Sequence, residues 1–300
     1  MFTLWILITI VFSLIRLMPE GPFMNNSMSA QVRESLQAAY NLDGSFIEQY
    51  FTYIGNLVQG NFGISMIRRG HQITETIATT FSVSAIIGFV TVFFSIAIGI
   101  VLGISTALRH RKITNKVLFL LITLANTIPS FLVAIILVHF LEIRWRLLPP
   151  TGFGSPYHYI VPIIALGFGC VAFVARAIRI RLMDIRNSDY MRTARAKGLS
   201  EKTIIVKHGL RNALIPTIRY LVPLLGILLT SAFAIESIFF IPGLAREFVQ
   251  GASNGDYTML LGITTFFCIF LIISNFVTDM LYLVINPSKR YQREQNNGRQ

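Results

Sequence analysis

The sequence predicts an all-α membrane protein with six transmembrane helices. Three observations predict this fold class: the composition is strongly apolar, the apolar residues form six long segments, and the basic residues lie beside those segments. Hydrophobic residues make up 53% of the 300 positions, charged residues make up only 13%, and the mean hydropathy is +0.62. A water-soluble domain of this size carries more charge, so residues 1–300 are expected to form one membrane domain in a lipid bilayer.

The first predicted span covers residues 1–17. It is short, because a helix needs about 20 residues to cross a bilayer. A secretory signal peptide is the alternative, but such a peptide has a charged start and a small-residue cleavage site, and this segment has neither. Pro19 and Pro22 end the helix, because proline lacks the backbone N–H that a helix needs.

Residues 20–75 are mixed and polar and are predicted to form an extracytoplasmic segment. Two stretches within it place apolar residues on one helical face. Both are too short and too interrupted to span a bilayer, so they either pack as a small external cap or rest at the membrane surface. The first face consists of Val32, Leu36, Ala39 and Tyr40, and the second of Phe46, Tyr50, Tyr53, Ile54 and Leu57.

Five further apolar segments complete the predicted bundle. Pro129 falls inside the third span, where it removes a backbone hydrogen bond and kinks the helix. Such a kink can shape the pathway of a transporter, and it also occurs in spans without a special role. Trp145 follows that span and fits an anchor at the membrane interface. The five segments are residues 79–108, 117–140, 159–180, 217–240 and 259–285.

The basic residues set the predicted orientation. Four lie in residues 109–116, eleven in 176–219 and four after Pro287, which places 19 of the 26 lysines and arginines on one side of the membrane. Cytoplasmic loops carry such an excess, so these segments are predicted to be cytoplasmic. With six spans, the N-terminus is then cytoplasmic as well.

The same distribution argues against a nucleic-acid partner despite the net charge of +12, because the basic residues lie beside apolar spans and do not alternate with aromatic residues. The chain has no G-x-x-x-x-G-K-[ST] loop and is not expected to hydrolyse ATP alone. It has neither H-E-x-x-H nor a cysteine and histidine group at metal-ligand spacing, so no metal or other cofactor is predicted. Cys170 and Cys268 lie in apolar segments, where buried free cysteines are expected in place of a disulfide framework.

Ionisable residues inside spans are costly and mark functional sites by default. Only Glu236, near the external end of the fifth span, and Asp279, near the internal end of the sixth, come close. Both could reach water or a partner charge, so a structural role is an equal alternative for each. The spans contain no relay of acidic residues at the midplane, which argues against a proton-coupled carrier.

Residues 188–216 stand out because they are polar and basic and lie between two long spans. Ser188 or Asp189 is predicted to begin a short helix, and Gly198 suits the left-handed residue that stops it. Ser200 can begin a second helix by capping its first turn. An ordinary cytoplasmic loop is the alternative interpretation.

The spacing in this loop resembles a known motif. Thr193, Ala194 and Gly198, followed by residues 211–216, resemble the EAA loop of the membrane subunits of ATP-binding-cassette importers, in the form of the peptide and nickel permease family. The resemblance covers nearly the whole chain, and the Gly-Pro-Phe run at 21–23 is closest to the oligopeptide branch. The further matching segments, in chain order, are 18–23, 61–63, 128–131, Glu236 with Phe239, 242–244, and Asp256 with Tyr257.

The resemblance implies a type I importer permease architecture and a set of partners. These are a related second permease, two ATPase subunits that bind the ATP, an extracytoplasmic substrate-binding lipoprotein and a peptide substrate, in the inner or plasma membrane of a bacterium. It also implies a basic leader before the first span, so the true start is expected upstream of Met1. Arg192 and Asn286 stand where the wider class has Glu and Asp, and the second departure leaves the role of that carboxylate open.

In that family the loop forms a coupling helix that docks in a cleft of the ATPase. The resemblance implies apolar contacts from this helix to the ATPase, charge contacts from its arginines, and a turn at Gly198. A movement of the helix would then move the fourth and fifth spans and change the side to which the pathway opens. The expected coupling residues are Asp189, Met191, Arg192, Ala194, Arg195, Lys197, Gly198 and Leu199.

The predicted pathway combines polar groups of the spans with a turn beyond the fifth span. The polar groups can equally bond to their own helix backbone. The Pro-Gly turn within 235–248 can equally be a plain connection between the fifth and sixth spans. The pathway candidates are Asn126, Pro129, Ser130, Thr230, Glu236, Pro242 and Gly243.

The predicted function is therefore that of a non-catalytic membrane subunit that takes up oligopeptides delivered by an external binding protein. A dipeptide permease or a nickel or metal-chelate permease of the same family is the alternative. A secondary carrier and a membrane scaffold belong to other classes. The carrier would need internal repeats and intramembrane charges, and the scaffold would not need the coupling loop.

Overall fold

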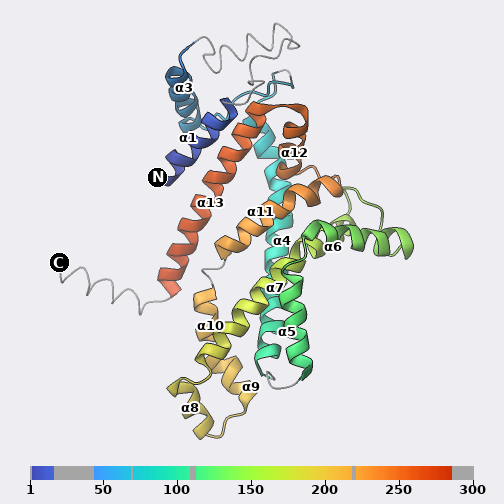
Figure 1. Cartoon of the computed structure of the whole chain (residues 1–300), viewed down its shortest axis with the longest axis vertical. Coiled ribbons are helices and arrows are strands. Elements are labelled where there is room, and N and C mark those ends of the chain that lie inside the picture. The colour runs from blue at the N-terminus through green and yellow to red at the C-terminus, as the bar shows by residue number, and fades with distance from the viewer. Residues whose placement is uncertain (1, 17–43, 69, 109–112, 218–220, 286–300) are drawn as a thin grey trace, which may run out of the picture. The chain divides into compact units, whose positions relative to one another are not determined.

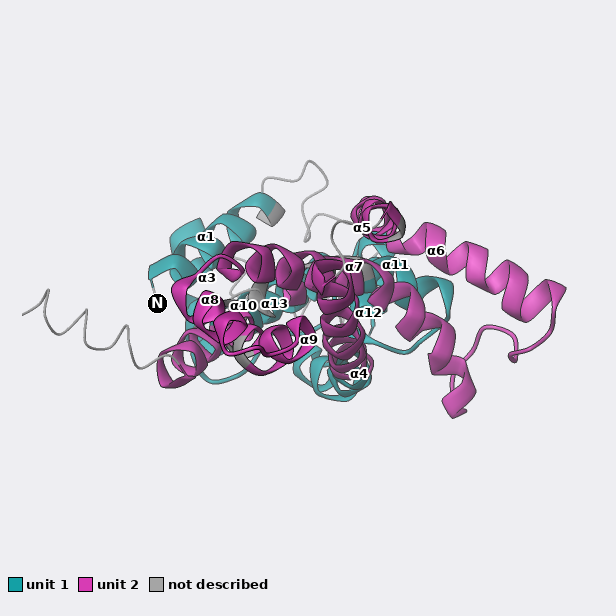
Figure 2. Ribbon diagram, turned by 90° about the horizontal axis from the view of Figure 1, so that it is seen from below, with its two compact units in different colours: residues 1–86, 232–272 teal, residues 87–231, 273–300 magenta. Residues whose placement is uncertain are grey.

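The computed structural model describes residues 2–16, 44–68, 70–108, 113–217 and 221–285. Within these ranges the chain is helical, and its β structure is a single isolated bridge between Ile64 and Gln72 (Figure 1). Two compact units divide the chain: residues 1–86 with 232–272, and residues 87–231 with 273–300 (Figure 2). Three long helices pass from one unit into the other: α4 (Ile73–Leu108), α11 (Leu221–Ile238) and α13 (Tyr257–Ile285).

The first unit is built around the aromatic face of a short helix. Besides parts of the three long helices it contains α1 (Phe2–Arg16), α3 (Phe46–Val58) and α12 (Leu244–Asn254). The α3 helix begins with a capping box, in which Ser45 and Glu48 each accept a backbone N–H of the other. The ring of Tyr53 stacks on Phe12, with centroids 5.6 Å apart, and its hydroxyl is 2.9 Å from that of Thr265.

The amphipathic helix predicted around 46–57 is thus confirmed, and its inner face packs on the chain's own helices. Tyr53 is 1% exposed and belongs to a core with Ile8, Phe12, Met66 and Leu261. This result favours the packed cap over a helix that rests at the membrane surface. The other predicted amphipathic face, at Val32 to Tyr40, lies outside the described residues.

The second unit contains the remaining helices, and these include the helices of the segment that follows the fourth predicted span. They are α5 (Ile113–Ala125), α6 (Ser130–Leu137), the π-helix η1 (Val138–Arg144), the 3₁₀-helix η2 (Pro156–Tyr159), α7 (Ile160–Ile185), α8 (Asp189–Ala196), α9 (Glu201–Thr203), the π-helix η3 (Ile204–Gly209) and α10 (Leu210–Thr217).

Small residues bring α4 and α7 into close contact in this unit. Gly99 and Gly103, one turn apart on α4, face Val174 and Ile178 on α7. A Cβ atom at either glycine would lie only 2.7 or 2.8 Å from the facing side chain. Such small-residue seams let helix backbones approach closely, which is the usual way that helices pack within a membrane.

Three helices among the described residues are long and apolar enough to cross a membrane: Ile73–Leu108, Pro156–Ile185 and Tyr257–Ile285. They contain the predicted spans at 79–108, 159–180 and 259–285. Helix α1 matches the extent of the first predicted span, but its apolar part, Phe2–Leu14, is short. The fifth predicted span falls partly on residues outside the description, so the count of six stays a prediction.

The predicted third span, residues 117–140, is wrong as a continuous kinked helix. The chain instead breaks between α5 and α6, and the two helical pieces meet at 103°. Pro129 is the N-cap of α6, so it starts a new helix there instead of bending one. Four helices qualify as spans if this bent pair counts as one.

Candidate functional site

The predicted helix of the basic loop forms as α8, with a sharp stop. Ser188 is its N-cap, and the Ser188 carbonyl accepts the N–H groups of Met191 and Arg192. The Ser188 hydroxyl does not cap the helix, because it donates to the Ile185 carbonyl at 2.7 Å. Gly198 has φ +76°, the left-handed conformation predicted for the residue that ends the helix.

The second predicted cap is also present. The Ser200 hydroxyl oxygen accepts the N–H of Thr203 at 3.3 Å and begins α9, with Glu201 in the first turn. From there the backbone continues through η3 and α10 to Thr217. The loop is therefore two helices around a turn at Gly198.

One face of α8 is covered by the chain itself. Met191 is 0% exposed, and Ala194 is buried as well. The terminal methyl group of Met191 and the side chain of Leu182 on α7 both lie over Gly209 at the end of η3. This apolar contact docks α8 on the end of α7 and on η3.

Arg195 fastens the same face. Its Nε donates to a Glu201 carboxylate oxygen at 2.7 Å, and its Nη1 donates to the Arg186 carbonyl at 3.0 Å. Ala194 and Arg195 follow Met191 by three and four positions, so both lie on the same side of the helix as Met191. Met191 and Ala194 are turned toward the chain itself, whereas the Arg195 side chain keeps 30% of its accessible surface, so the direct ATPase contact expected of all three stays a prediction.

The opposite face of α8 and the residues that follow the helix are exposed. Asp189 and Arg192 lie on α8, Lys197 is its C-cap and Leu199 follows Gly198; all four are exposed, and the Arg192 side chain retains 70% of its accessible surface. Arg192 and Asp189 approach only to 3.8 Å, an exposed pairing that contributes little. Tyr190 is an exposed aromatic residue beside these charges that the sequence analysis did not single out. It directly precedes the buried Met191, and neighbouring side chains on a helix point to different sides.

The pathway candidates near Pro129 lie at the break between α5 and α6. Asn126, Thr127, Ile128 and Pro129 are all exposed, and Ser130 is the first residue of α6. The hydroxyl of Thr127 donates to the Leu124 carbonyl at 2.7 Å, as predicted for polar side chains that satisfy their own backbone. Non-helical backbone at membrane depth is tolerated where it faces protein or water, not where it faces lipid.

The helix α5 is too short to cross a bilayer by itself. Its 13 residues span roughly 20 Å at 1.5 Å per residue, against about 30 Å for the hydrocarbon core. Residues 126–129 therefore fall within the hydrocarbon region if α5 starts at its cytoplasmic edge. An exposed break at that depth must meet another protein surface or a water-filled passage.

Glu236 and Gly243 belong to a closed cluster in the first unit. Glu236 is 2% exposed, and its carboxylate accepts the Ser84 hydroxyl at 2.6 Å and the Arg246 N–H at 3.0 Å. The Ser84 oxygen in turn accepts the N–H of Leu244 at 2.8 Å. The two side chains cap the free N–H groups at the start of α12.

Gly243 makes this cap possible. A Cβ atom there would lie 2.3 Å from a carboxylate oxygen of Glu236, so another residue cannot fit without moving the carboxylate. The arrangement favours the structural alternative for both Glu236 and Gly243. Pro242 is exposed, and the side chain of Thr230 lies outside the described residues, so their place in a pathway stays a prediction.

The described residues offer no group of three or more histidine, cysteine, aspartate or glutamate side chains that could hold a metal ion. Cys170 is buried and Cys268 partly buried, and both thiols are free.

Comparisons with known proteins agree with this picture. Residues 99–291 match the family described as binding-protein-dependent transport system inner membrane component, a range that includes both the break and α8. The chain is 37% identical over 292 residues to the oligopeptide transport system permease protein OppB of Haemophilus influenzae, covering 96% of this chain and 95% of that one. It is 35% identical over 286 residues to the dipeptide transport system permease protein DppB of Bacillus subtilis, covering 95% and 93%.

A solved structure shows the same fold. It is an inward-facing structure of the MetNI methionine ABC transporter, with a TM-score of 0.60 and 18% sequence identity. The match covers 70% of this chain and 96% of that chain.

Proposed function

Because this chain belongs to the family of binding-protein-dependent transport system inner membrane components, we propose that it is the membrane-spanning subunit of an ATP-driven importer and forms half of a pathway for oligopeptides. It is a multi-pass membrane protein, as its long apolar helices and its family require. The relatives named oligopeptide and dipeptide permeases support a peptide substrate. Their identities of 37% and 35% are too close to separate the two lengths, so a dipeptide permease is the second candidate.

The outward face of α8 is the ATPase docking surface in this proposal. The observation that carries it is the division of α8 into a buried apolar face and an exposed charged face, within a segment whose pattern resembles the coupling loop. Asp189, Arg192, Lys197 and Leu199 contact the ATPase directly. Met191, Ala194 and Arg195 transmit the movement, because they fasten α8 to α7 and η3.

A rigid connection leads from α8 into the membrane helices. Arg179 on α7 donates to the Thr106 carbonyl of α4 at 3.2 Å, and its guanidinium lies 3.8 Å from the ring centre of Phe119 on α5. Together with the glycine seam of α4, these contacts tie the ends of three helices together. A displacement of α8 is thereby passed on to α4, α5 and α7. The two states of the subunit are then the two orientations of the pathway, each open to a different side of the membrane.

The break at 126–129 lines the pathway next to the second permease. Its exposed backbone and the side chain of Asn126 need water or protein at membrane depth, and a passage between two permease chains supplies both. ATP is bound by two separate ATPase subunits, and an extracytoplasmic lipoprotein delivers the peptide. Both termini and α8 face the cytoplasm, as the distribution of lysine and arginine indicates.

Reconstitution tests the proposal. The chain is purified with a second permease and the ATPases, and uptake of labelled dipeptides, longer oligopeptides and nickel is measured with and without ATP. We expect ATP-dependent uptake of oligopeptides, and loss of the ATPase from the purified complex when residues 189–197 are deleted. Uptake without ATP would point to a secondary carrier, and retention of the ATPase by the deletion variant would remove α8 from the docking surface.

A further inference from the structure

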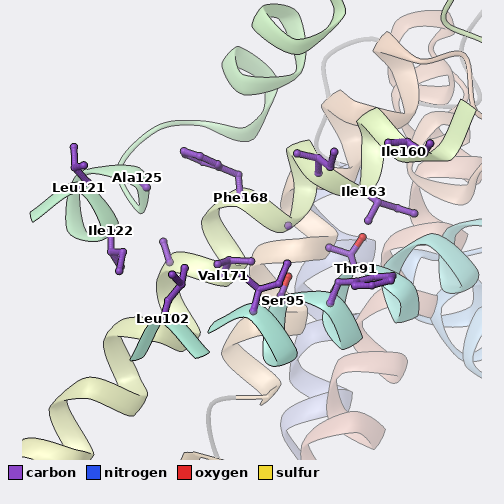
Figure 3. Close-up of a pocket in the computed structure, with 15 residues that line it drawn as sticks. Thr91, Ser95, Leu102, Leu121, Ile122, Ala125, Ile160, Ile163, Phe168 and Val171 are labelled. Atoms are coloured by element: carbon purple, nitrogen blue, oxygen red, sulfur yellow. The ribbon is translucent and has the colours of Figure 1, made fainter. Parts of the chain in front are cut away.

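A cavity of about 590 Å³ opens between α4, α5 and α7, all within the second unit (Figure 3). Leu102 on α4, Ile122 on α5 and Phe168 on α7 are among its lining residues. Apart from two hydroxyl groups, every lining residue is aliphatic, aromatic or glycine. The volume falls in the range of sites that hold small apolar ligands.

The two hydroxyl groups belong to Thr91 and Ser95, one turn apart on the α4 wall (Figure 3). Both are buried, and neither Thr91 Oγ1 nor Ser95 Oγ has a hydrogen-bond partner among the described residues. Elsewhere on α4 the hydroxyl of Thr106 donates to the Leu102 carbonyl at 2.8 Å, the usual solution inside a helix. A buried hydroxyl without a partner is costly, so an acceptor from a bound molecule would stabilise this wall.

The depth of the cavity in the membrane indicates what kind of molecule fits. At 1.5 Å per residue, Leu102 lies about 9 Å and Thr91 about 26 Å from the end of α4 at Leu108. The basic residues that follow Leu108 mark the inner edge of a hydrocarbon core about 30 Å thick. Thr91 therefore lies near the outer edge, Ser95 lies one turn deeper at about 20 Å from Leu108, and the apolar part of the cavity extends toward the middle of the bilayer.

We propose that this cavity binds one acyl chain of an outer-leaflet phospholipid, with Thr91 and Ser95 donating hydrogen bonds to its ester carbonyl. The acyl chain follows the apolar wall toward Leu102. A peptide substrate is a poor match, because the lining has no charged group for its termini.

Photolabelling in nanodiscs tests the proposal on the full chain assembled with its partners. The nanodiscs contain phosphatidylglycerol, and a small part of this lipid carries a diazirine in the middle of one acyl chain. We expect the label on the cavity wall near Leu102, Ile122 and Phe168. In Ala125→Phe, whose new ring fills the cavity, this labelling should fall by more than about fivefold.

The matched control is Val101→Phe, which places the same ring on the exposed side of α4. Val101 is 65% exposed and does not line the cavity, so labelling of the cavity wall should stay unchanged. The double variant Thr91→Val with Ser95→Ala keeps the shape of the wall and removes both donors. It should lower the preference for ester-linked over ether-linked phosphatidylglycerol by roughly 2- to 10-fold for each hydroxyl.

Two results would overturn the proposal. One is equal labelling of the cavity wall in the native chain, in Ala125→Phe and in Val101→Phe, which would mean ordinary contact with bulk lipid. The other is a cross-link from a cysteine at Phe168 to the second permease without lipid label, which would mean that protein fills the cavity. Because labelling is measured without transport, its outcome is separate from that of the uptake experiment.

Discussion

The buried cap around Glu236 and the exposed face of α8 use polar residues in opposite ways. At Glu236 each polar group has a fixed partner inside the first unit, and the carboxylate is 2% exposed. On α8 the apolar side chain of Met191 is inside, while Arg192 and Lys197 are outside. A buried charged residue with fixed hydrogen-bond partners can therefore stabilise the fold of an apolar chain, whereas solvent-exposed charges are available to a partner protein.

The largest effect is expected from Gly243→Ala, which tests whether the cap is as rigid as described. The new Cβ atom would lie 2.3 Å from Glu236, so the carboxylate must leave the N–H groups of α12. We expect a loss of more than about 3 kcal/mol in the free energy of unfolding, measured by thermal denaturation of the purified protein.

The matched control for this variant is Gly55→Ala on α3. That glycine has no atom of the described residues within 4 Å of the Cβ position, and alanine favours a helix, so stability should stay equal or rise. Equal stability of the Gly243 and Gly55 variants would mean that the cap is loose.

Glu236→Ala and Glu236→Gln separate a structural role from a role in the pathway. The alanine variant leaves Ser84 and the start of α12 without their acceptor, which should cost about 2–4 kcal/mol. The glutamine variant keeps one of the two accepting oxygens and loses the charge at the helix N-terminus, so we expect a smaller loss of about 1–2 kcal/mol. Peptide uptake per folded molecule should be unchanged in the glutamine variant, and a selective loss of uptake there would return Glu236 to the pathway.

Met191→Ala and Arg192→Ala compare the two faces of α8. Removing the buried methionine should destabilise the docking of α8 by about 2–4 kcal/mol, because a cavity remains beside Leu182 and Gly209. Removing the exposed arginine should change stability by less than about 0.5 kcal/mol and still weaken ATPase copurification. Hydrogen exchange of residues 189–196 and a pull-down assay measure the two effects, and a firmly bound ATPase in the Arg192 variant would argue against the docking surface.

A smaller effect than that of Met191→Ala is expected at Gly198. No atom of the described residues lies within 4 Å of its Cβ position, so a side chain there meets only the cost of the left-handed conformation, about 1–2 kcal/mol. ATP-driven uptake should fall in Gly198→Val and stay nearer normal in Gly198→Asn, because asparagine tolerates positive φ. Membrane insertion should be intact in both variants, and unchanged uptake by the valine variant would remove the reason to assign a coupling role to this glycine.

The parts of the molecule that the sequence predicted well are those set by local chemistry. The start of α8 at Ser188, its stop at Gly198 and the cap at Ser200 each depend on residues only a few positions apart. That Met191 and Ala194 share a face also follows from their helical spacing, but the burial of that face depends on Leu182 and Gly209 elsewhere in the chain.

The parts that could not be predicted depend on distant residues. Ser84 and Glu236 are 152 positions apart, and no local pattern joins them. The same holds for the break at Pro129: proline predicts a disturbance, but the 103° angle depends on what α6 packs against. The unpartnered hydroxyls of Thr91 and Ser95 are visible only when the other residues of the cavity are in place.

Site-specific cross-linking tests the docking of α8 most directly. In a variant with Cys170 and Cys268 replaced by alanine, a single cysteine is placed at Arg192 and, in a second protein, at Arg246. In a complex that still imports peptide, we expect an ATP-sensitive cross-link from position 192 to the ATPase and none from position 246. A complex that imports peptide and forms no cross-link from position 192, or forms one from position 246, would contradict it.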